Sequence, residues 1–196
     1  MQKIRQKNKP GSLAFMEKYG GNVAGFFWNA GTALQLVFGL AALSPREIVS
    51  ACVNFASPAS YLLFGHRNWG VAVGGILGII GTFLAVYPQI AAGEAGSIFG
   101  FCAFCLCVSM SIFSAPLTHR FRHAGRKILR ETFGHPRRLS GLGSFFFTRL
   151  PIIAECAAHQ RWRLAAVFAL WACGDLTLSF SRAEGLPLEA IRTLKP

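Results

Sequence analysis

The chain has little charge, and very little of that charge is negative. Of its 196 residues, 14% are charged and only eight are Asp or Glu, whereas about 25% of the residues in a typical soluble domain are charged. Hydrophobic residues make up 53% of the sequence. This balance argues against a soluble globular domain and favours a membrane protein.

The sequence also lacks the arrangements that enzymes use. It has no Ser-His-Asp grouping, no phosphate-cradling glycine loop and no pair of carboxylates at catalytic spacing, so we expect no enzymatic activity. The cluster Cys102-x-x-Cys105-x-Cys107 lies in an apolar run without a histidine or carboxylate. We interpret these cysteines as small hydrophobic residues and not as metal ligands. Neither a metal nor another cofactor is expected.

The positive charge is concentrated outside the apolar runs. A net charge of +12 would suggest nucleic-acid binding in a soluble protein. Here the basic residues gather in a tail at 1–20 and a loop at 118–140, as they do in the cytoplasmic segments of membrane proteins. We therefore expect no nucleic-acid partner. The expected location is the cell membrane, in bacteria the inner membrane, as a multi-pass protein with its N-terminus and this loop in the cytoplasm.

Long apolar runs define the expected membrane spans. The run Gly70–Pro116 is divided by Glu94 into two pieces, each about as long as the roughly 20 residues that cross a bilayer. Asn22–Leu43 and Ile48–Phe64 predict two spans upstream, and Trp162–Phe180 predicts one downstream.

The span count depends on Gly141–Ala158, which is apolar but contains Arg149, Pro151 and Glu155. If this segment crosses the membrane, the chain has six spans and a cytoplasmic C-terminus. If it does not, the chain has five spans and ends outside. We expect an all-α polytopic membrane bundle of six helices, with five as the alternative. The predicted units are a basic tail (1–20), a four-helix membrane region (21–117), a basic amphipathic loop (118–140), a helical hairpin (141–181) and a C-terminal tail (182–196).

Ionisable residues within membrane spans are functional candidates, and this sequence has three: Arg149, Glu155 and Asp175. Arg149 and Glu155 point to different faces of a straight helix, so Asp175 is the expected partner of Arg149. The pair would either fix the register of two helices or relay a proton or substrate.

The basic loop has apolar residues at near-helical spacing among its charges, which is typical of a helix lying on an anionic membrane surface. We expect anionic lipid headgroups to contact its basic residues, which are Arg120, Arg122, Arg126, Lys127 and Arg130.

The first half of the chain contains an internal echo. Asn22–Phe64 parallels Val71–Pro116, since each has an apolar helix, a glutamine near its outer end (Gln35; Gln89), a short turn and a second apolar helix. Both first helices run outward, so these are parallel repeats, as in some transporters.

At Tyr87-Pro88-Gln89-Ile90, followed by the polar turn Gly96-Ser97 and a second helix, the chain resembles the PQ-loop families, which include the SWEET and SemiSWEET sugar transporters. The resemblance covers about residues 21–117. It implies two parallel PQ-loop-like hairpin repeats and alternating-access transport of a small solute, a sugar or a small carboxylate. The polar path expected for that solute comprises Asn29, Gln35, Asn54, Tyr61, Pro88 and Gln89.

A second function stays open. The chain could be a non-transporting membrane scaffold or assembly factor whose basic loop binds anionic lipid or a protein partner. A polar cavity would favour the transporter, and a dry, tightly packed bundle would favour the scaffold. The expected partners are the lipid bilayer, anionic headgroups and, as an alternative, further copies of the same chain.

Overall fold

The computed structural model describes residues 11–64, 68–120 and 141–180. All the long elements in these ranges are helices, as the sequence predicts. They are α1 (Gly11–Ala41), α2 (Pro45–Phe64), α3 (Asn68–Ala91), α4 (Ala95–Arg120), the π-helix η1 (Ser144–Arg149), α7 (Leu150–Ala158) and α8 (Trp162–Phe180).

Three short turns join these helices into antiparallel hairpins, and all three turns have the same backbone. In the first, the Ser44 N–H donates to the Gly39 carbonyl at 2.9 Å, and the Leu43 N–H donates to the Leu40 carbonyl at 3.2 Å. This is the Schellman pattern that satisfies the last carbonyls of a helix. The same two bonds recur in the turns at 92–94 and 159–161. The left-handed residues of the three turns are Leu43, Gly93 and Gln160.

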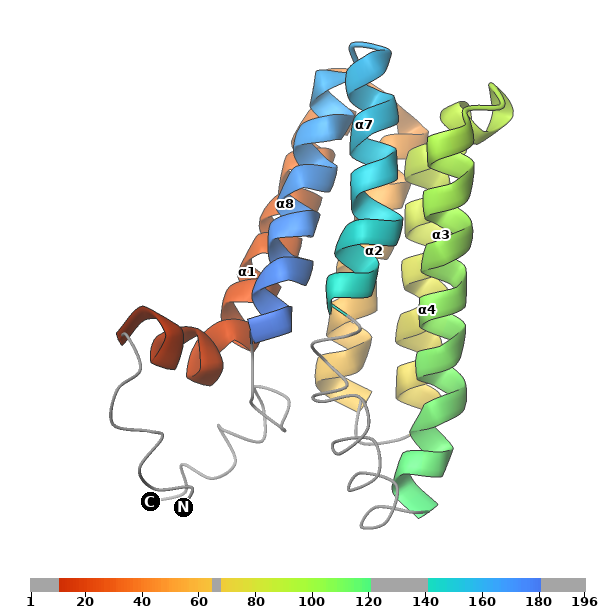
Figure 1. Ribbon diagram of the computed structural model, residues 1–196. Helices are drawn as coiled ribbons and strands as arrows, with labels where there is room; N and C mark the ends of the chain where they lie inside the picture. The colour runs from red at the N-terminus through yellow and green to blue at the C-terminus, as the bar shows by residue number, and fades with distance from the viewer. Residues whose placement is uncertain (1–10, 65–67, 121–140, 181–196) are drawn as a thin grey trace.

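All three turns lie at one end of the bundle, at the top of Figure 1. The start of α1, the end of α4 and the end of α8 lie at the opposite end. Each helix packs on its neighbours in the chain, and α8 packs on α1. The helices therefore close into a ring in chain order.

Glycines allow α3 to approach α2 closely. Ser50 of α2 donates a hydrogen bond to the Gly81 carbonyl at 2.7 Å, and Ser57 donates to the Gly74 carbonyl at 2.8 Å. A Cβ atom at Gly81 would collide with the side chain of Asn54. Small residues let helix backbones meet and form such bonds in lipid, so Gly74 and Gly81 allow α2 to pack directly against the α3 backbone.

Gly141–Ala158 forms one continuous helical segment between α4 and α8. Its first half widens into the π-helix η1, in which the Leu150 N–H donates to the Phe145 carbonyl. Pro151 follows directly and has no N–H to donate, which explains why the wider helical turn lies just before it. π-Helical turns are often found at functional sites, and Arg149 is the last residue of this one.

The inside and outside of the ring differ as expected for a membrane protein. Phe168, Ile152 and Val86 are fully buried at its centre. Among the described residues, three helical segments are long and apolar enough to cross a membrane, namely Val23–Ala41, Ala72–Ala91 and Trp162–Phe180. Soluble monomers rarely expose large continuous apolar patches, yet large apolar side chains are exposed on every helix of the ring, including Phe26, Val49, Ile76, Leu106, Phe147 and Phe180.

Several sequence predictions concern residues outside the described part of the chain. These are the tail before residue 11, the C-terminal tail and most of the basic loop, including Arg122, Arg126, Lys127 and Arg130. Arg120 is the last residue of α4.

Candidate functional site

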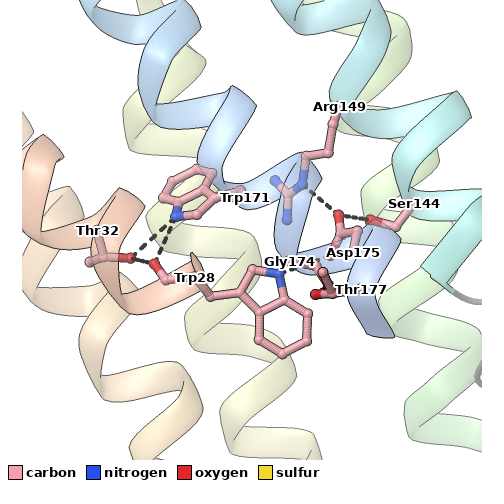
Figure 2. Close-up of polar contacts among 8 residues, drawn as sticks. All are labelled: Trp28, Thr32, Ser144, Arg149, Trp171, Gly174, Asp175 and Thr177. Carbon is pink, nitrogen blue, oxygen red and sulfur yellow. Dashed lines mark hydrogen bonds and ion pairs between the residues drawn. The ribbon is translucent and has the colours of Figure 1, made fainter. Parts of the chain in front are cut away.

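A buried carboxylate joins three helices near the middle of the ring (Figure 2). Asp175 of α8 accepts hydrogen bonds from the Arg149 Nε of η1 at 2.9 Å, the Ser144 Oγ of η1 at 2.7 Å and the Trp28 Nε1 of α1 at 3.0 Å. The side chains of Arg149 and Asp175 are only 8% and 6% exposed. The predicted pairing of these two residues is therefore confirmed. A charge in the interior requires such partners, because an unpaired one is costly.

Two tryptophans lock α1 against α8 beside this pair. The Trp171 Nε1 of α8 donates to the Trp28 carbonyl at 3.1 Å, and its indole covers Gly31. In return, the indole of Trp28 covers Gly174 of α8, as Figure 2 shows. A methyl group at either glycine would collide with the opposite ring. These contacts bring the two helices close enough for Trp28 to reach Asp175.

The Arg149 guanidinium is enclosed by aromatic rings. Its Cζ lies 5.2 Å from the Phe104 ring centre, 5.7 Å from Phe168 and 5.2 Å from Trp171, within the range of cation–π attraction. Its Nη1 is buried and has no hydrogen-bond partner among the described residues. The three hairpin turns can be aligned on their left-handed residues. In this alignment Arg149, which lies eleven residues before Gln160, corresponds to Thr32 in α1 and Thr82 in α3.

A second buried polar network joins α1, α2 and α3. The Gln35 Nε2 donates to Ser50 Oγ at 2.8 Å, and Asn54 Nδ2 donates to Gln35 Oε1 at 3.2 Å. Ser50 in turn donates to the Gly81 carbonyl. Both polar atoms of the Gln35 amide therefore have partners, and this network closes the bundle below the turns.

A cavity of about 540 Å³ lies above this network, at the end of the bundle that carries the turns. Two glutamines reach it from α1 and α3, and three arginines come from the starts of α2 and α8 or the turn before α8. Its polar and charged lining residues are Gln35, Gln89, Arg46, Glu47, Gln160, Arg161 and Arg163. Pro88, Phe38, Leu164 and Val167 are among its apolar lining residues.

No protein-family model, curated protein or solved structure matches the chain. The geometry of its own residues therefore carries the functional argument.

One ion pair and one hydrogen bond connect the second and third hairpins at the rim of the cavity. The two guanidinium nitrogens of Arg161 contact the two carboxylate oxygens of Glu94 at 2.7 and 2.6 Å. Glu155 Oε2 accepts a hydrogen bond from the Gly96 N–H at 2.8 Å. Glu94, Glu155 and His159 are close enough to share a cation. However, an ion would have to displace Arg161 from Glu94. These contacts are therefore better explained as structural contacts that hold the two hairpins together than as a metal centre.

The structure brings together only part of the path predicted from the sequence. Gln35, Pro88 and Gln89 line the cavity. Asn54 does not line it but donates a hydrogen bond to Gln35, which does. Asn29 is exposed on the outer face of α1. Tyr61 lies at the C-terminal end of α2, at the opposite end of the bundle from the three hairpin turns and the cavity. Among the intramembrane charges, Glu155 lies apart from the Arg149–Asp175 pair, and none of these three lines the cavity.

Sequence reasoning missed the cationic residues of the cavity. Arg46, Arg161 and Arg163 are not among the site residues expected from the sequence. Arg46 follows the first hairpin turn, whereas Arg161 and Arg163 lie at the third turn and the start of the helix after it, so they meet only because α8 packs on α1. The one available signal was the recurrence of a helix, a short turn and a second helix, which occurs three times and not twice.

Proposed function

We propose that the chain is an integral membrane protein that crosses the bilayer six times and transports a small solute by alternating access. The observation that carries this proposal is the cavity lined by Gln35, Pro88 and Gln89. These three residues belong to the path expected from the PQ-loop resemblance. Binding sites are typically concave, mainly apolar and furnished with a few polar groups, which describes this cavity.

Six crossings are supported by the antiparallel order of the ring. The segment Gly141–Ala158 runs alongside α4 and α8 and has its own Schellman turn at 159–161. Four crossings lie between the N-terminal tail and the loop at 118–140, which places both on the same side, as their shared positive charge requires, whether the chain crosses six or five times in all. The cavity then opens on the side opposite the cytoplasm.

In this proposal, the described conformation faces outward. The Gln35–Ser50–Asn54 network closes the cavity from below. Pro88 leaves the α3 hydrogen-bond ladder one bond short, next to the wall of the cavity. α3 would bend there when the cavity closes outside and opens inside.

Uptake into proteoliposomes tests the proposal. Purified protein would be screened with small sugars and small carboxylates, with a dye that reports proton flux. We expect uptake of at least one solute, and a marked reduction for Gln89→Leu in the cavity wall. The matched control is Gln6→Leu in the N-terminal tail, which should transport normally. A protein that transports none of these solutes but binds anionic vesicles would instead support the scaffold.

A further inference from the structure

We propose that the cavity at the turns binds a small carboxylate that also carries a hydrogen-bond donor, such as a 2-hydroxycarboxylate. This inference names the substrate class and, in that respect, rests on the proposed function. Three observations support the inference. They are the positive charge of the cavity lining, the unpartnered polar atoms of two lining residues, and the order of these residues from the mouth of the cavity inward.

The charge of the lining is positive. Three arginines and one glutamate line the cavity. Arg161 is already held by both oxygens of Glu94. Arg163 stacks on the Phe38 ring at 5.8 Å, and no carboxylate of the described chain is within ion-pair distance of it. Arg46 is 4.0 Å from Glu47, the limit of an ion pair. The guanidinium of Arg163 is thus without an ionic partner in the described structure, and that of Arg46 has only a long contact with Glu47. Both groups match the shape of a carboxylate.

Two residues of the cavity lining each have one buried polar atom without a hydrogen-bond partner in the described structure. Gln89 is only 3% exposed, and its Oε1 has no hydrogen-bond partner in the described structure. The buried Nε of Arg46 likewise has none there. Buried polar groups are normally hydrogen-bonded, and each exception requires an explanation. A ligand that reaches both atoms would need one acceptor and one donor to satisfy them.

These groups are ordered along the cavity. The arginines lie at the starts of α2 and α8, close to the turns. Gln89 lies farther back along α3, and Gln35, farther still along α1, is already satisfied by Ser50 and Asn54. A ligand would therefore place its carboxylate at the mouth and its donor against Gln89.

The remaining wall argues against a sugar. Phe38, Pro88, Leu164 and Val167 are apolar, and Gln89 Oε1 is the one buried amide atom of the lining that lacks a partner among the described residues. A polyol would bury several hydroxyl groups against this wall without partners, and each such group is costly. A small carboxylate with a short apolar chain fits the same wall.

Binding of three matched probes to the purified full-length protein in phosphatidylcholine nanodiscs tests the inference by calorimetry. Lactate has the anion and the donor, propionate lacks the donor, and lactamide lacks the charge. We expect lactate to bind about threefold to tenfold more tightly than propionate and at least tenfold more tightly than lactamide, from the usual strengths of neutral and charged hydrogen bonds. Equal binding of lactate and lactamide, or no binding of lactate, would overturn the inference.

Variants assign the two contacts. Gln89→Leu should make lactate and propionate bind equally, and Arg163→Gln should weaken both anions severalfold without affecting lactamide. Arg120→Gln, at the opposite end of α4, should change neither. If Gln89→Leu keeps the preference for lactate, the donor does not lie against Gln89 and the proposed arrangement is wrong.

A lipid headgroup could supply a similar anion. The titration is therefore repeated in nanodiscs that contain phosphatidylglycerol. An unchanged lactate affinity supports a soluble ligand, whereas competition would assign the cavity to lipid and overturn the inference. Uptake of a sugar without lactate binding would retain transport but exclude this substrate class. Lactate binding without uptake of any solute would retain the site but remove the proposed function.

Discussion

Removing one member of the buried Arg149–Asp175 pair should destabilise the protein strongly. Asp175 accepts three hydrogen bonds, and Arg149 is its ionic partner at 2.9 Å. Breaking a buried pair from one side costs about 3–5 kcal/mol because the other charge stays buried. Arg149→Met keeps an apolar chain among the surrounding rings. Asp175→Asn keeps an acceptor oxygen for the Trp28 N–H, and the Ser144 hydroxyl can turn to accept from the new amide N–H.

Each single variant leaves one uncompensated charge, whereas the double variant leaves none. We therefore expect the double variant to be more stable than the sum of the single effects allows, with a coupling of about 2–3 kcal/mol. Unfolding of purified protein in dodecyl maltoside by added dodecyl sulfate measures all four proteins of the cycle. The Glu94–Arg161 pair provides a control. Arg161 is 35% exposed and Glu94 is 6% exposed, so the coupling of this half-exposed pair should be smaller than that of the fully buried pair.

Simple additivity of the Arg149 and Asp175 effects would refute the reasoning, because residues that do not interact contribute independently. Arg149 would then lie at the membrane interface, on a segment that does not cross, and the five-span arrangement would gain support. If the double variant recovers both stability and uptake, the pair only fixes helix register. If it recovers stability but not uptake, the pair acts in transport.

Three further outcomes are expected. Gly174→Ala should lower stability and abundance because the new methyl group meets the Trp28 ring. Gly25→Ala, which has open space around it, should be tolerated. Equal loss in both variants would argue against the close α1–α8 contact. Pro88→Ala should reduce uptake more than thermal stability, and unchanged uptake in an active protein would exclude a hinge there. A phosphatase fusion after Arg130 should be inactive and a fluorescent cytoplasmic reporter active, since the loop is predicted to be cytoplasmic; the reverse would invert the orientation.

Much of the fold follows from hydropathy, because a backbone in lipid must satisfy its own hydrogen bonds and an apolar run must therefore be helical. The helix ends are less evident from the sequence. α1 begins at Gly11 and not near Asn22. The apolar run shows where the helix is expected to cross the membrane, but it does not show that the same helix extends for several more polar residues beyond that crossing. The pairing of Arg149 with Asp175 was predictable because a buried charge needs an opposite one.

The facing of individual residues was harder to predict. Asn29 was expected inside the bundle, but its neighbour Trp28 takes the inward position and bonds to Asp175. Successive residues of a helix differ by about 100° in direction, so polarity alone does not select the correct one. The arginines at the cavity come together only because the ring closes where α8 packs on α1. That closure depends on glycine contacts between distant segments, such as Gly31 with Trp171.

The central claim is that a water-filled cavity opens on the side away from the cytoplasm. Ala85 lines this cavity, whereas Ala51, which is also buried, does not. Each would be replaced by cysteine in a chain whose six native cysteines are changed to alanine, and then exposed to a membrane-impermeant thiol reagent on either side of the membrane. The account predicts that Ala85→Cys reacts from the outside only and that Ala51→Cys stays unreactive. Reaction of Ala85→Cys from the cytoplasmic side alone, or from neither side, would contradict it.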